Sequence, residues 1–212
     1  MWKRWKITVI GLLSLVFSQA TQAQFFGYAQ QYAVGAVVLT SGTQLRGTVM
    51  LYPARGVVQV KKASDSVYTF AAPMVQCVAV EEQQERITAD KLVSTLRVFR
   101  PYYVLNKSSL QPTWAFFEQI SDGPVALLRY QRPSQYVSAN MVYSTSVDNF
   151  FLALGTNNVL PLRATKKDLL AFFKQKAPQI EQYAKENNLH YTNARELAFI
   201  VNYANSLPAP QP

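Results

Sequence analysis

The fold is decided by the stretch VVLTSGTQLRGTV at residues 37–49, in which two β-patterned segments flank a glycine turn. Residues 36–40 are rich in β-branched side chains, and Ser41-Gly42-Thr43 follows them as a turn. Leu45 and Val49 then alternate with more polar neighbours, as a half-buried strand requires. The stretch therefore predicts a hairpin at the start of a β-rich region.

Further short apolar segments continue this pattern along the chain. We expect strands over residues 57–61, 67–70, 75–80, 96–99, 102–105, 114–120, 125–131, 136–145, 150–154 and 159–162. Closely spaced short strands are typical of a small barrel or sandwich. Asp122-Gly123 is a favourable hairpin turn between two of them. The polar segment 81–86 is ambiguous between a loop and a helical turn, and Pro101 separates two strands.

Beyond Arg163 the spacing of apolar residues becomes helical. Thr165 with Asp168, and Asn193 with Glu196, resemble capping pairs at helix starts. We predict a bundle of about three short helices over 164–206, packed on a β-rich region at 35–163. The expected class is α+β, an antiparallel β-rich small barrel or sandwich with this C-terminal bundle. Residues 207–212 form a Pro-rich tail.

The N-terminus reads as an export signal. Residues 1–23 combine a basic start, an apolar run over 7–17 and Ala23 before a favourable cut. Cleavage would leave a short leader at 24–34, and an uncleaved N-terminal anchor is the alternative. No second apolar run of that length follows. We therefore expect an exported protein, in the periplasm or at the cell surface, with no stable membrane span after signal removal.

The first hairpin resembles the opening of small SH3-like or Sm-like barrels, over roughly residues 35–82. The chain also resembles uncharacterised secreted β-rich proteins of Bacteroidota. These pair such a barrel with a hairpin like FFEQISDGPVALL at 116–128 and end in short helices, as in IVNYAN at 200–205. The resemblance implies this architecture and brings no catalytic residue, cofactor or established ligand.

Composition argues against several function classes. The formal charge of the 212-residue chain is +9, but the basic residues are scattered and no nucleic-acid-binding motif accompanies them, so we expect no nucleic-acid partner. The one cysteine, Cys77, lies in an apolar strand, which favours a structural thiol over a nucleophile. The one histidine, His190, lies in a polar connection, so a typical zinc site is excluded. We expect no metal and no other cofactor.

Two patterns offer candidate ligand-binding residues. Glu118 shares strand parity with Trp114 and Phe116, and an aromatic face beside a carboxylate could hold a sugar, although a solvent-facing glutamate is the simpler interpretation. Several arginines lie near strand tyrosines and could form a basic, aromatic surface for an anionic glycan, although aromatic residues in strands more often pack in the core. These arginines are Arg97, Arg100, Arg129 and Arg132. The predicted ligand-binding set is Trp114, Glu118, Arg129, Tyr130 and Arg132, with no catalytic residue.

Together these observations favour an exported, non-enzymatic binding or scaffold protein of the bacterial cell envelope. Its partner would be an envelope protein or a glycan. A carboxylate-dependent glycan hydrolase is the first alternative, and it needs two placed acids. The candidate acids are Glu81, Glu82, Glu85, Asp90 and Glu118. The second alternative is a subunit of an envelope complex.

Overall fold

Ten antiparallel strands form one sheet in the computed structural model, which describes residues 28–84, 93–105, 111–138 and 141–208. The strands are β1 (Gln30–Leu39), β2 (Gln44–Tyr52), β3 (Val57–Lys61), β4 (Val67–Ala71), β5 (Val75–Gln84), β6 (Val93–Leu105), β7 (Pro112–Gln119), β8 (Ala126–Ser138), β9 (Met141–Leu154) and β10 (Asn158–Leu162). Their order in the sheet is β10-β9-β8-β7-β6-β5-β1-β2-β3-β4. The β-rich α+β class predicted from the sequence is therefore confirmed at this level.

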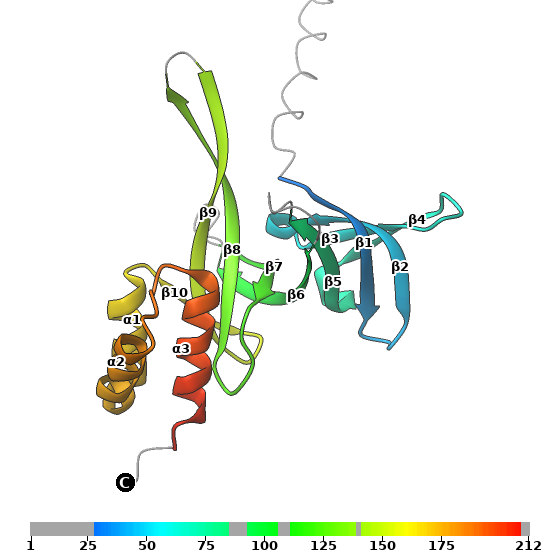
Figure 1. Ribbon diagram of the computed structural model, residues 1–212. Helices are drawn as coiled ribbons and strands as arrows, with labels where there is room; N and C mark the ends of the chain where they lie inside the picture. The colour runs from blue at the N-terminus through cyan, green and yellow to red at the C-terminus, as the bar shows by residue number, and fades with distance from the viewer. Residues whose placement is uncertain (1–27, 85–92, 106–110, 139–140, 209–212) are drawn as a thin grey trace, which may run out of the picture.

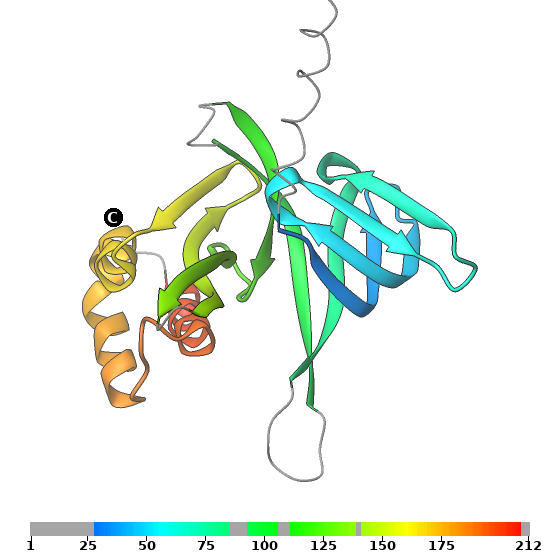
Figure 2. The ribbon, with the colours of Figure 1, turned by 90° about the horizontal axis from the view of Figure 1, so that it is seen from above.

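The first five strands curl into a half-barrel around one apolar core (Figures 1 and 2). Alternate residues point inward, so Val37, Val49 and Val58 are fully buried. The tight curl depends on Gly47, because a Cβ at this position would lie 2.1 Å from the backbone oxygen of Lys61. The predicted hairpin at 37–49 is present as β1 and β2, and β1 begins at Gln30, inside the segment predicted as a leader.

Strand β6 runs unbroken through Pro101, where the sequence predicted a separation. Its pairing with β5 ends at Phe99, whereas its pairing with β7 continues to Leu105. Pro101 therefore lies where β6 has a ladder partner on one side only, a position that tolerates a residue without a backbone N–H. The predicted polar connector at 81–86 is also corrected, since β5 extends to Gln84.

The C-terminal helices cover one face of the β8–β9 hairpin (Figure 1). They are α1 (Thr165–Phe173), the 3₁₀ turn η3 (Lys174–Lys176), α2 (Ala177–Glu186) and α3 (Ala194–Ser206); two further 3₁₀ turns, η1 (Pro53–Arg55) and η2 (Ala72–Met74), lie in the half-barrel. Leu197 and Ile200 share an apolar cluster with Leu127 and Leu152 of the strands. No helix within the described part of the chain is long and apolar enough to cross a membrane.

Two capping interactions hold the starts of these helices. The Asn193 side chain accepts hydrogen bonds from the backbone N–H groups of Arg195 and Glu196, so the Asn193 half of the predicted pair is confirmed, whereas the Glu196 carboxylate accepts from His190 instead of from Asn193. At α1 the N-cap is Ala164, and the Asp168 carboxylate accepts from its backbone N–H at 2.9 Å. The predicted partner of Asp168, Thr165, is instead the first residue of the helix.

Candidate functional site

Glu118 lies at the centre of a buried charge network in the middle of the sheet. Glu118 belongs to β7, and its side chain is 6% exposed. One carboxylate oxygen accepts from Arg97 Nη2 at 2.7 Å and from Arg129 Nε at 2.8 Å, and the other accepts from Arg129 Nη2 at 3.0 Å. Arg129 faces Glu118 because the two residues are register partners on β8 and β7. Both oxygens are thus held by guanidinium groups.

Arg97 joins this network to the half-barrel. Its Nη1 donates to Glu82 at 2.8 Å, and its Nη2 also donates to Gln131 at 2.8 Å. The guanidinium lies over the rings of Tyr32 and Phe99. Burial acts against its charge, but the hydrogen bond and charge of Glu118 outweigh burial, and the pKa of Arg97 is raised. Arg97 therefore carries a permanent positive charge in the core.

The network continues outward to β9 through Asp148. Its carboxylate accepts a hydrogen bond from the Gln131 side-chain amide at 3.0 Å and lies 3.5 Å from Arg129 Nη1. Side chains from five adjacent strands, β5 to β9, are consequently linked. One apolar core fills the half-barrel, and another lies beneath the C-terminal helices. Because the charged side chains lie between these two cores, the network joins the two halves of the sheet.

The opposite face of the same strands is hollowed into a groove of about 1170 Å³. Successive residues of a strand point to opposite faces, so Phe117 and Tyr130 lie on the other side of the sheet from Glu118 and Arg129. Phe117 packs against Tyr130 and Phe151, with ring centroids 5.3 and 5.1 Å apart. Two exposed arginines, Arg132 and Arg163, also line the groove.

The groove is polar at its margin and apolar at its base. Arg132 Nη2 donates to the Asn149 side-chain oxygen at 3.2 Å, while Arg163 makes no ion pair within the described residues. Burial raises the pKa of the Tyr130 hydroxyl, with the charge of Arg132 acting in the opposite direction. The hydroxyl is thus a protonated hydrogen-bond donor at neutral pH. Such a mixture of aromatic surface and a few polar groups is typical of ligand sites.

The structure divides the five predicted ligand-binding residues between three places. Glu118 and Arg129 meet in the buried network, so neither offers a free group to a ligand. Trp114 lies on the same face, as the strand parity predicted, but packs against the half-barrel core and Tyr103. Tyr130 and Arg132 line the groove on the opposite face.

Sequence reasoning missed most of the network around Glu118 and Arg129. Arg97 was expected on a basic surface, but its side chain is buried. Glu82 lies in the segment expected to be a loop or a helical turn, yet it pairs with Arg97 from strand β5. Gln131 and Asp148 were not singled out at all. Alternation along β8 could have placed Gln131 beside Arg129, but no sequence signal places Arg97 against them. Glu85 and Asp90 lie outside the described residues.

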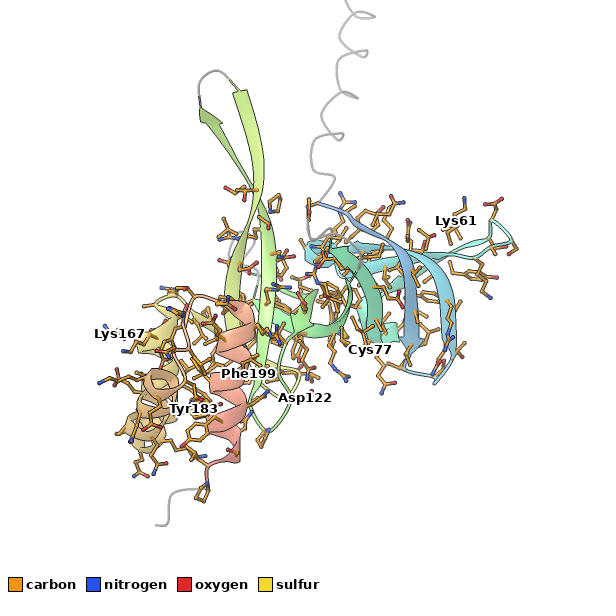
Figure 3. The ribbon with its side chains drawn as sticks, in the orientation of Figure 1. Lys61, Cys77, Asp122, Lys167, Tyr183 and Phe199 are labelled. Carbon is orange, nitrogen blue, oxygen red and sulfur yellow. The ribbon has the colours of Figure 1, made fainter. Side chains whose placement is uncertain are left out.

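The remaining candidates have local roles. Cys77 is a partly buried free thiol on β5 (Figure 3). His190 Nδ1 lies 2.8 Å from Glu196 Oε2, and that oxygen also accepts from the His190 backbone N–H, which together lower the pKa of Glu196. Within the ranges that the structure describes, no three His, Cys, Asp or Glu side chains gather as a metal site needs. No family model, curated protein or solved structure matches this chain.

Proposed function

We propose that this chain is an exported, non-enzymatic binding module of the bacterial cell envelope, and that an anionic glycan binds in the groove across β6–β10. The observation that carries the proposal is the combination of two exposed arginines, Arg132 and Arg163, with an aromatic base in one groove. The guanidinium groups match carboxylate or sulfate substituents. Tyr130 and Phe151, which are only partly buried, offer the apolar surface on which a sugar ring packs.

The charges around the groove favour an anionic ligand. Asp148 is the one carboxylate among the described residues that line it. That carboxylate already accepts from Gln131 and pairs with Arg129, whereas the partner of Arg132 is a neutral asparagine. The arginines therefore remain available to a negatively charged group. The volume of about 1170 Å³ is of the order that a short oligosaccharide requires.

The disposition of acids gives less support to the hydrolase alternative. Cleavage of a glycosidic bond needs two carboxyl groups facing one another across the substrate. Arg97 lies between Glu118 and Glu82 and bonds both, and Arg129 lies likewise between Glu118 and Asp148. Glu118 also faces away from the groove, on the other side of the sheet. Its carboxylate acts as a structural anion that holds two arginines.

Calorimetric titration with two oligosaccharides of equal length tests the proposal. Oligogalacturonate, which carries carboxylates, should bind, and an uncharged galactose oligomer should bind far more weakly. Arg132→Gln and Arg163→Gln should each weaken oligogalacturonate binding by about tenfold, the value of one charge-assisted hydrogen bond. Lys185→Gln, at an exposed position on α2 outside the groove, is the control for loss of one positive charge and should leave binding unchanged. Equal losses in all three variants, or no oligogalacturonate binding, would contradict the proposal.

Export has a separate test. The chain recovered from the exported fraction should have the intact mass of a protein that begins at Gln24. Retention of residues 1–23 in that fraction would contradict cleavage of the signal.

A further inference from the structure

A second basic surface lies on the half-barrel, remote from the groove, at the β3–β4 hairpin. Figures 1 and 3 show this hairpin projecting away from the rest of the fold, with Lys61 near its end. A hollow of about 470 Å³ opens beside it, between the hairpin and strands β1 and β2. Three cationic side chains line the hollow, from Arg46, Lys61 and Lys62, against the single carboxylate of Asp65.

The register of the strands explains why these charges gather. Lys61 is the partner of Thr48 across β3 and β2, so it shares a face with Arg46, two residues earlier on β2. Lys61 Nζ pairs with Asp65 at 2.8 Å, which neutralises that carboxylate. Arg46 makes no ion pair within the described residues, and Lys62 lies over the Tyr68 ring, 4.9 Å from its centroid. The surface therefore keeps a net positive charge.

Exposed apolar side chains accompany the cations. Val67, the register partner of Lys61, is 57% exposed, and Tyr68 beside it is 39% exposed. Val34, which lines the hollow, is 51% exposed. Both faces of the projecting hairpin thus carry an apolar residue next to a lysine. Basic residues interspersed with exposed apolar side chains are typical of proteins that lie on a bilayer, where tyrosine rings sit at the level of the headgroups.

We propose that the β3–β4 hairpin and the adjoining hollow dock on a membrane surface rich in anionic phospholipid. The headgroup phosphates lie against Arg46 and Lys62, and Val67 and Tyr68 enter the interface. Charge complementarity selects this occupant, because three cations converge on a hollow whose one carboxylate is already paired. The proposal is independent of the glycan groove, which lies in the other half of the sheet.

Flotation with lipid vesicles tests this docking. The full chain is mixed with vesicles of phosphatidylcholine alone or of phosphatidylcholine with phosphatidylglycerol, at low and at raised salt. Residues 1–23, which include a basic start and an apolar run, are common to all variants, so only a difference between variants is assigned to the hairpin. We expect the anionic vesicles to bind more protein and added salt to reduce the difference, since salt screens exposed charges.

Two variants and a matched control make the test specific to the hairpin. Arg46→Gln with Lys62→Gln should weaken binding to anionic vesicles by about 25-fold, or about fivefold for each cation removed. Asp65→Asn should strengthen it by about fivefold, because it removes the one carboxylate and frees Lys61. Asparagine tolerates the positive φ of 61° at this position. Lys167→Gln with Lys185→Gln removes the same charge from exposed positions on α1 and α2 and should change binding little.

Three results would overturn the inference. The first is equal binding to neutral and anionic vesicles by the unaltered chain. The second is an equal loss in the hairpin variant and the helical control, which would reflect net charge alone. The third is hairpin-dependent binding of a soluble polyanion such as oligogalacturonate without binding to vesicles, which would assign this surface to a soluble ligand.

Discussion

Replacing Glu118 by glutamine should destabilise the fold by about 3–5 kcal/mol, because it leaves two buried guanidinium groups without their central anion. Glutamine keeps the volume of the side chain but has one acceptor oxygen and no charge. In the native protein Glu118 accepts three hydrogen bonds from Arg97 and Arg129. Among the residues that the structure describes, the only carboxylate then left beside Arg97 is Glu82, and the only one beside Arg129 is Asp148, at the longer distance of 3.5 Å.

The expected loss is large against the roughly 5–15 kcal/mol that stabilises a typical domain. At about 2–4 °C per kcal/mol for a chain of this size, the midpoint of thermal unfolding should fall by about 6–20 °C. Urea unfolding followed by circular dichroism measures the free energy directly. Glu82→Gln is the matched control, because the Glu82 side chain is 38% exposed and pairs with the same arginine. Its cost should stay within about 1 kcal/mol.

The two variants together separate burial from charge. A Glu118→Gln loss below about 1 kcal/mol, or one equal to that of Glu82→Gln, would refute the view that the network depends on a buried central anion. Replacing Arg97, Glu118 and Arg129 together by methionine, leucine and methionine should cost much less than the single change. Such a replacement leaves no unpaired buried charge.

Three further predictions concern single contacts. Burial raises the pKa of Tyr32 to about 12, so the free energy of unfolding that depends on its protonated hydroxyl is fully present below pH 10 and is lost, by up to about 2–3 kcal/mol, as the pH rises to about 12. Tyr32→Phe should flatten that part of the profile of unfolding free energy against pH. The Asn205 side chain hydrogen-bonds the backbone of Val125 and of Asp122 at the β7–β8 turn, which lies beside α3 in Figure 3. Asn205→Ala should lower the free energy of unfolding in urea by about 2–3 kcal/mol, and a loss under about 0.5 kcal/mol would contradict the role of these bonds. Ile200→Asp places a charge in the fully buried cluster beneath α3 and should produce dye-binding or aggregation at ambient temperature, whereas Phe199→Asp, at a 45% exposed position of the same helix, should not.

Local patterns in the sequence were enough for much of the architecture. The alternation around Gly42 predicted the β1–β2 hairpin, and Asp122-Gly123 marked the connection between β7 and β8. The change to helical spacing after Arg163, with the cap at Asn193, marked the helical end. These features depend on backbone preferences and on side chains a few residues apart, so the sequence alone is enough to predict them.

The tertiary structure alone decided which residues meet. Strand parity placed Trp114 and Glu118 on one face, but it could not show that Arg97, 21 positions before Glu118, would bury its guanidinium against that carboxylate. Nor could it show that Arg129 would bond Glu118 in the buried network, whereas Tyr130, the next residue, would line a groove on the opposite face of the sheet. Periodicity determines which way a side chain points, whereas its neighbours depend on sheet order and register, which long-range pairing sets.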